Sequence, residues 1–289
     1  MDGELIRAII LGIVQGITEF LPISSDGHLV VVQTLLRACG IAATTAPAGA
    51  PHVSDLQFDV VLHIGTLAAI LVVYRSDLWE LRKQPRLCGL LVLATLPAVV
   101  AGLTLKDSIE KAFNSPLMAG LGFLVTAGCL YFASRCPPGV RTIQDLTARD
   151  SLLIGLAQAT AILPGVSRSG TTISTGIGVG LRRDLSATWS FLMAVPVVAG
   201  AIVLILKDML KQPATITRPD TLIVGTLVSF VVGLIALRWL IRVLARGGLR
   251  GFALYCLIAG IAVTGWQLIA PSPTTPDHNA TVPAPRSPS

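Results

Sequence analysis

Hydrophobic residues gather along this chain into six long stretches, with short polar segments between them. The stretches cover about 58–74, 88–105, 117–134, 186–206, 221–240 and 251–269. Each approaches the roughly 20 apolar residues that a helix needs to cross a bilayer. The pattern therefore predicts about six transmembrane helices.

Two further apolar regions are each broken by a polar loop. The first joins residues 4–21 to 28–38, and the second joins 151–163 to 171–181. The pieces are too short to cross a membrane singly, so each pair is interpreted as a re-entrant hairpin that enters and leaves on one side. Irregular backbone at this depth is tolerated only inside protein or around a wet cavity, so the two loops should face each other.

The two hairpins match in sequence. A shift of 143 residues places Gly12 on Gly155, Gln15 on Gln158, Ser24 on Ser167 and Gly27 on Gly170, and a weaker match, Thr95-Leu96 with Thr226-Leu227, has a shift of 131. Paired broken segments of this kind mark a site between inverted repeats. We expect an all-α integral membrane protein, with one domain at 1–270, inverted repeats at about 4–134 and 151–269, and a disordered, proline-rich tail at 271–289.

Composition and charge support a membrane location. Hydrophobic residues make up 53% of the chain and charged residues only 13%, against about a quarter in soluble domains. The net charge of +6 does not indicate nucleic acid, because the basic residues lie in small clusters and only 5% of residues are aromatic. If the chain changes side of the membrane at each of the six crossings, 13 of the 22 Lys and Arg residues lie on the same side. The positive-inside rule assigns that side to the cytoplasm. The five cysteines show no metal-ligand spacing and are expected to be inert.

The first loop carries the residues of a reactive site. Gln15 and Glu19 share one helix face, and an acid within the membrane is functional by default. Glu19 could hold a divalent cation or act as a general base. Ser24, Ser25 and His28 follow Pro22, and a serine close to a histidine suits nucleophilic and acid–base chemistry.

The second loop has the parts of an anion-binding site. Arg168 offers a planar donor that suits phosphate, and glycines let backbone N–H groups approach a ligand at the start of a helix. The hydroxyl and glycine groups expected to help are Ser167, Ser169, Gly170, Thr171 and Thr172. The segment is not a Walker loop, because the Gly-Lys-Ser/Thr ending is missing.

Three segments, 15–28, 58–66 and 163–174, together resemble the signature segments of the undecaprenyl-diphosphatase, or bacitracin resistance protein, family. The similarity runs from about Glu4 to Ala270. The resemblance implies a multi-pass enzyme of the bacterial inner membrane that hydrolyses undecaprenyl diphosphate to undecaprenyl phosphate and phosphate, with its site open to the outer side. Such an enzyme recycles the lipid carrier for peptidoglycan and other cell-wall polymers and confers bacitracin resistance.

Carried over residue by residue, the resemblance places the family's acidic motif on Gln15 and Glu19, its serine–histidine loop on Ser24, Ser25 and His28, and its phosphate loop on Ser167, Arg168, Ser169, Gly170 and Thr172. It implies a divalent cation, Mg²⁺ or Ca²⁺, near Glu19. Two positions depart from the family: Gln15 stands where Glu is frequent, and Asp26 stands where Thr is frequent and could supply a replacement carboxylate.

Several alternatives stay open at this point. The nucleophile could be Ser25, His28 or a water activated by His28, and the protein could act alone or as a homodimer. The main rival function is a transporter that moves a prenyl phosphate across the membrane without cleaving it, because inverted repeats with broken helices are typical of carriers.

Overall fold

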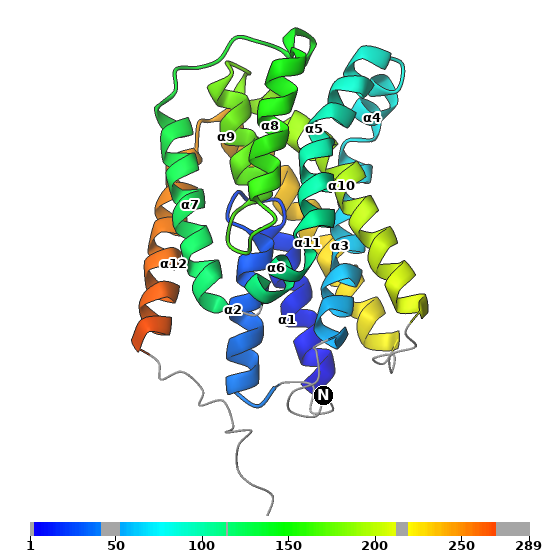
Figure 1. Ribbon diagram of the computed structural model, residues 1–289, viewed down its shortest axis with the longest axis vertical. Coiled ribbons are helices and arrows are strands. Elements are labelled where there is room, and N and C mark those ends of the chain that lie inside the picture. The colour runs from blue at the N-terminus through cyan, green and yellow to red at the C-terminus, as the bar shows by residue number, and fades with distance from the viewer. Residues whose placement is uncertain (1–2, 42–52, 114, 212–218, 270–289) are drawn as a thin grey trace, which may run out of the picture.

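The computed structural model describes residues 3–41, 53–113, 115–211 and 219–269, and within these ranges the chain is helical, with no strand (Figure 1). The helices are α1 (Gly3–Thr18), α2 (Ser25–Ala38), α3 (Val53–Val73), α4 (Arg75–Leu81), α5 (Pro85–Thr104), α6 (Lys106–Phe113), α7 (Pro116–Arg135), α8 (Ala148–Thr160), α9 (Arg168–Gly178), α10 (Arg183–Lys211), α11 (Pro219–Ala245) and α12 (Leu249–Ile269), with a 3-10 turn at Ile143–Asp145. The all-α membrane fold predicted from the sequence is confirmed. The expected tail at 271–289 lies outside the described residues.

The six predicted crossings correspond to α3, α5, α7, α10, α11 and α12. Five helices of the described chain are long and apolar enough to span a bilayer by themselves. The sixth, α3, continues after Tyr74 into α4 with a bend of 73°, so that this pair counts as one broken span. The short helices α4 and α6 were not predicted, because neither has a long apolar run.

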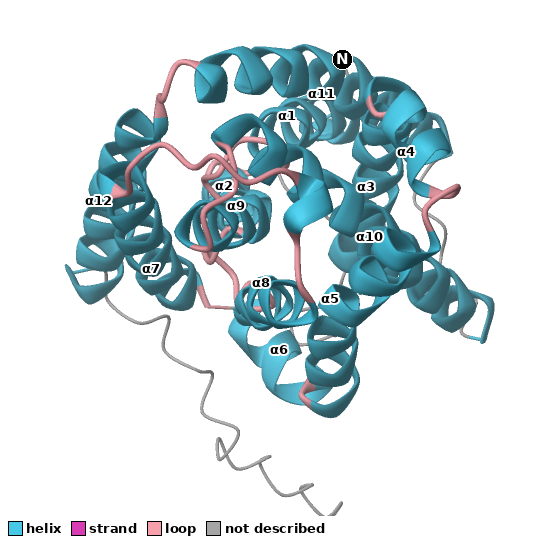
Figure 2. Cartoon of the chain, turned by 90° about the horizontal axis from the view of Figure 1, so that it is seen from above, coloured by secondary structure: helices cyan, strands magenta, loops and turns pink. Residues whose placement is uncertain are grey.

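Both predicted hairpins are present. The helices α1 and α2 rise from one end of the bundle, α8 and α9 descend from the other, and the two connecting loops meet near its middle (Figures 1 and 2). Each returning helix starts with the same cap: the Ser24 hydroxyl accepts from the Gly27 N–H at 3.3 Å, and the Ser167 hydroxyl accepts from the Gly170 N–H at 3.0 Å. These four residues are the pairs related by the 143-residue shift.

The first helix of each hairpin packs against a crossing helix from the other half of the chain, α1 against α11 and α8 against α5. A Cβ added to Gly12 would lie 2.8 Å from the carbonyl oxygen of Gly225, and one added to Gly155 would lie 2.4 Å from that of Ala94. Gly12 and Gly155 are related by the shift of 143, and Ala94 and Gly225 by the shift of 131. The two contacts are therefore equivalent, although the division into two repeats stays a prediction.

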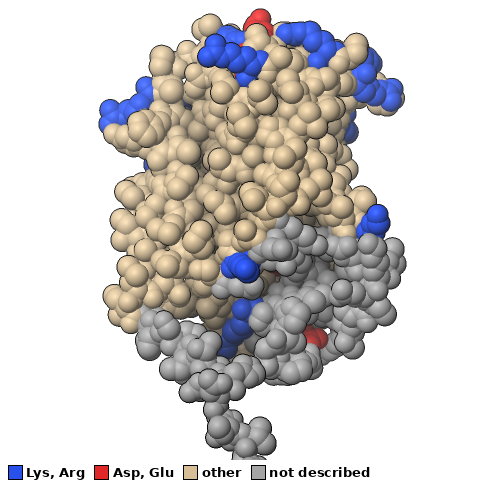
Figure 3. All heavy atoms as spheres, viewed as in Figure 1, with Lys and Arg blue, Asp and Glu red and all other residues tan. Residues whose placement is uncertain are grey.

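Lys and Arg side chains gather at one end of the bundle, around α4 and the connection from α7 to α8 (Figure 3). We call this the basic end. The middle of the visible face is almost free of charged residues, as expected for a surface in contact with lipid. The α8–α9 hairpin starts at the basic end, and the α1–α2 hairpin starts at the opposite end (Figure 1).

Candidate active site

The loops of the two hairpins touch directly. A Cβ added to Gly27 would lie 2.7 Å from Cα of Gly165, which is closer than any real contact allows. Gly165 itself has φ of +86°, a conformation that favours glycine. The second loop is held from α7, because the Thr126 hydroxyl donates to the Gly165 carbonyl at 2.9 Å and accepts from the Ser167 N–H at 2.8 Å. Sequence reasoning missed Thr126, which lies in an otherwise apolar crossing.

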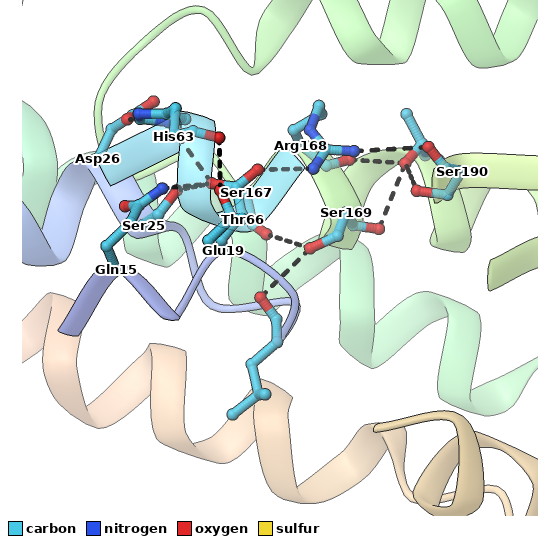
Figure 4. Close-up of polar contacts among 12 residues, drawn as sticks. Gln15, Glu19, Ser25, Asp26, His63, Thr66, Ser167, Arg168, Ser169 and Ser190 are labelled. Carbon is cyan, nitrogen blue, oxygen red and sulfur yellow. Dashed lines mark hydrogen bonds and ion pairs between the residues drawn. The ribbon is translucent and has the colours of Figure 1, made fainter. Parts of the chain in front are cut away.

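A buried ion pair joins the two loops. Arg168 donates from Nη2 to Oε1 of Glu19 at 2.8 Å, and the two side chains are only 14% and 5% exposed (Figure 4). A second guanidinium nitrogen, Nη1, lies 3.4 Å from the carbonyl oxygen of Ser190 on α10. The predicted acidic residue and the predicted phosphate-binding residue are thus brought together.

The other oxygen of Glu19 accepts hydrogen bonds from two predicted site residues. The Ser25 hydroxyl donates to Oε2 at 2.7 Å, and the Gln15 amide donates to the same atom at 3.2 Å. Ser24, just before Ser25, is the only non-glycine residue of the described chain with a positive φ, at 72°. Such backbone strain is typical of functional sites, and here it fixes the direction in which Ser25 leaves the loop. A hydroxyl paired with a carboxylate is the arrangement of a nucleophile and its base.

The remaining hydroxyls of the second loop hold the first turn of α9. Thr171 and Thr172 donate to the Ser167 and Arg168 carbonyl oxygens at 3.0 and 2.7 Å, and Ser169 donates to the Leu21 carbonyl in the first loop at 3.2 Å. They were expected to touch an anion. In the structure they orient the N-terminus of α9, beside which the Arg168 guanidinium lies.

His28 is placed differently from its sequence neighbours. Its Nδ1 lies 2.6 Å from the Ser24 carbonyl oxygen, and its Nε2 lies 2.7 Å from the hydroxyl of Tyr255 on α12. The His28 ring stacks on the ring of Tyr255, with centroids 5.7 Å apart, and meets Phe123 edge-on. Both ring nitrogens of His28 therefore have partners other than the Glu19–Ser25 pair.

His63 belongs to the site and was missed from the sequence. Its Nε2 lies 3.6 Å from Oε2 of Glu19 and 3.9 Å from Oδ1 of Asp26, within ion-pair distance of both carboxylates. Its Nδ1 lies 2.7 Å from the Asp59 carbonyl oxygen, one turn earlier on α3. The available signal was the pair Asp59 and His63, two ionisable residues on one face of an otherwise apolar helix.

The site offers few protein ligands for a divalent cation. Within the described chain, no three His, Cys, Asp or Glu residues are placed to hold a metal ion together. Among the described residues, however, the carbonyl oxygen Oε1 of Gln15 is buried and has no hydrogen-bond partner, whereas the amide nitrogen of Gln15 donates to Glu19. One carboxylate and one carbonyl oxygen suit Mg²⁺, which commonly takes its other ligands from water and substrate phosphates.

Comparison with known proteins identifies the family of this chain. Residues 8–262 match the family model described as bacitracin resistance protein BacA. An undecaprenyl-diphosphatase of Rhodopirellula baltica is 45% identical over 262 residues, covering 90% of this chain and 97% of the relative. Undecaprenyl-diphosphatase 3 of Bacillus cereus is 40% identical over 260 residues, covering 89% and 95%. An undecaprenyl-diphosphatase of Carboxydothermus hydrogenoformans is 36% identical over 261 residues, again covering 89% and 95%. The chain thus belongs to the bacitracin resistance protein BacA family.

Proposed function

We propose that this protein is an enzyme that hydrolyses undecaprenyl diphosphate to undecaprenyl phosphate and inorganic phosphate. The observation that carries the proposal is the Glu19 carboxylate, which accepts from the Ser25 hydroxyl on one oxygen and from Arg168 on the other. Nucleophile, base and phosphate-binding cation thus form one buried cluster. The names of its relatives specify the same reaction.

In the proposed mechanism, the terminal phosphate binds between Arg168 and the N-terminus of α9. The Ser25 oxygen attacks the terminal phosphorus and its proton passes to Glu19, while the bond from that phosphorus to the bridging oxygen breaks. Glu19 returns the proton to the departing undecaprenyl phosphate. Water then attacks the phosphoserine, Glu19 takes its proton and passes it to Ser25, and phosphate leaves. Arg168 stabilises the charge that develops on the transferred group.

A divalent cation, Mg²⁺ or Ca²⁺, is part of the proposal. Glu19 and the carbonyl oxygen of Gln15 would hold it, with the remaining ligands from the diphosphate. Bound there, the cation would neutralise charge on the substrate.

The choice of Ser25 over His28 as nucleophile is supported by their neighbours. Ser25 contacts a carboxylate that can take its proton, whereas the His28 ring nitrogens face Ser24 and Tyr255. His28 would then orient the substrate at the edge of the site. A carrier that moves prenyl phosphate without cleaving it would need Arg168 to bind the phosphate. It would not need a hydroxyl paired with a carboxylate, as Ser25 and Glu19 are.

We also propose that the protein lies in the bacterial inner membrane with its basic end in the cytoplasm. The hairpin that carries Glu19 and Ser25 would then enter from the outer side, where the lipid carrier is released after wall synthesis. Activity there would return the carrier for peptidoglycan assembly and would oppose bacitracin, which sequesters the same diphosphate.

The test is phosphate release from undecaprenyl diphosphate by purified protein in detergent. Substrate labelled in its terminal phosphate should transiently label the wild-type chain and the Ser24→Ala variant, but not Ser25→Ala. Phosphate release by Arg168→Ala should fall at least about 100-fold, the usual cost of losing a transition-state donor. Absence of release by the wild type, with tight binding of undecaprenyl phosphate, would support the carrier instead.

A further inference from the structure

A cavity of ≈ 630 Å³ lies beside the first hairpin, between α1 and α2 on one side and the adjoining ends of α11 and α12 on the other. Its wall is almost wholly apolar and includes Ile13, Ile17, Val32, Trp239 and Phe252. The volume falls in the range of about 300–1,000 Å³ that is typical of small-molecule sites.

The cavity borders the first loop, because Leu21 and Ile23 of that loop line it. His28 and Tyr255 line it, and they are the pair whose rings stack and whose polar atoms lie 2.7 Å apart. Thr18, which also lines it, precedes Glu19 in the chain, and His28 follows Ser25 by one turn of α2. A molecule in the cavity therefore ends beside the loop that carries the reactive groups.

The cavity also opens sideways from the bundle. Ile13, Trp239 and Tyr255 are 39%, 47% and 45% exposed, and they lie on helices that the apolar surface places in the bilayer. Their exposed faces therefore meet lipid, so a membrane-dissolved chain can enter without crossing water.

From this geometry we infer that the cavity binds the part of the prenyl chain nearest the diphosphate, with Tyr255 positioning His28 where chain and headgroup join. The inference rests on the proposed function and adds the place where the substrate's hydrocarbon is recognised. An apolar wall with one polar end suits a long isoprenoid that carries a single charged head. The volume accommodates only the first units of the chain, and the rest stays in the bilayer.

Gly251 is a position in the cavity wall at which a larger side chain can be introduced. It lines the cavity on α12, and a Cβ added there would meet no atom of the described residues within 4 Å. Gly265 on the same helix is equally unobstructed and is not part of the wall, so it is the matched control. We expect Gly251→Phe to raise KM for undecaprenyl diphosphate about tenfold more than KM for methyl diphosphate, which has no prenyl chain, and Gly265→Phe to change neither KM.

A second measurement does not depend on turnover. An undecaprenyl phosphate with a nitroxide on its first isoprene unit should quench tryptophan fluorescence in the wild type, and Trp239→Phe should remove that component. Equal chain-length preference in Gly251→Phe and Gly265→Phe, or full quenching in Trp239→Phe, would overturn the inference. Equal quenching by a nitroxide-labelled phosphatidylglycerol would also overturn it, by making the cavity a general lipid site. If the wild type quenches but releases no phosphate from any diphosphate, the proposed function fails and the cavity assignment stands.

Discussion

The Arg168 guanidinium lies 2.8 Å from the Glu19 carboxylate, although 149 residues separate them along the chain. Each residue lies in the loop of a different hairpin, so the pair exists only when both hairpins are in place. Because both side chains are buried, loss of either partner leaves an uncompensated charge inside the protein, which costs about 3–5 kcal/mol.

Variants of Glu19 and Arg168 can distinguish an effect on stability from an effect on catalysis. We expect Glu19→Gln and Arg168→Gln each to lower the melting temperature in detergent, and the double variant to recover part of this loss. Phosphate release should stay at least about 100-fold below that of the wild type in all three variants, because the base or the phosphate donor is missing. Recovery of turnover in the double variant would contradict the roles assigned to both residues.

His63 and Asp26 should act as a coupled pair. Each single change, His63→Gln or Asp26→Asn, removes one member of the group around Glu19, and their effects on kcat/KM should not add. A double-mutant cycle should give a coupling energy of about 0.5–3 kcal/mol, as for other residues in contact. The matched cycle with Asp150→Asn in place of Asp26→Asn should give none, since Asp150 pairs with Arg141.

A variant of Asp26 tests whether this residue compensates for Gln15, which stands where the family frequently has Glu. If Asp26 supplies the carboxylate that Gln15 lacks, Asp26→Asn should shift the Mg²⁺ or Ca²⁺ concentration needed for half-maximal phosphate release at least about tenfold. Gln15→Glu in the same background should restore part of the affinity. An unchanged cation dependence in Asp26→Asn would end the idea that this residue is a ligand.

Contact between the loops predicts a steric effect at Gly27. A methyl group there would push against Gly165 and the Phe123 ring, so Gly27→Ala should lower both phosphate release and melting temperature. Gly178→Ala, at the end of α9, meets nothing within 4 Å and serves as the control. Normal activity of Gly27→Ala would mean that the loops separate during turnover.

A pH effect is expected at the start of α8, at the basic end. Burial of Asp150 favours its neutral form, but hydrogen bonds from Arg141 and Thr147 outweigh it and lower its pKa to about 2. A carboxyl with a depressed pKa stabilises the fold above its ordinary value of about 4, and this stabilisation is lost as pH falls from 4 toward 2. Asp150→Asn should therefore lower the free energy of unfolding at pH 7 by at most about 2 kcal/mol, with the difference vanishing near pH 2. An equal difference at both pH values would exclude the ion pair as its source.

Most of the fold follows from local sequence. Long apolar stretches specify crossings, and Pro22 and Pro164 end helices where an uninterrupted span would otherwise form. Short helices such as α4 do not stand out, because α4 lacks a long apolar run and follows α3 after a bend of 73° that the pattern does not reveal.

The site was predictable only where its residues share a loop. Glu19, Ser25 and Arg168 lie on the two polar breaks, and their chemistry indicates partnership. His63 lies within a crossing, and its place in the site depends on a contact with Glu19 that spacing along the chain does not reveal. His28 was assigned with its neighbour Ser25, yet its ring turns to Tyr255, which lies 227 residues away.

Helix α1 packs on α11 and α8 packs on α5, so each half of the chain contacts the other half. This arrangement affects the order in which the protein can assemble during synthesis. During synthesis the first hairpin enters the membrane before α11 has been made. The face of α1 at Gly12 and Gly16, which packs closely on α11, therefore has no partner until the second half is inserted. A gene divided between α7 and α8 should therefore yield two inactive polypeptides that regain activity when made together. Assembly of the two halves then becomes a step that cellular insertion factors can assist or block.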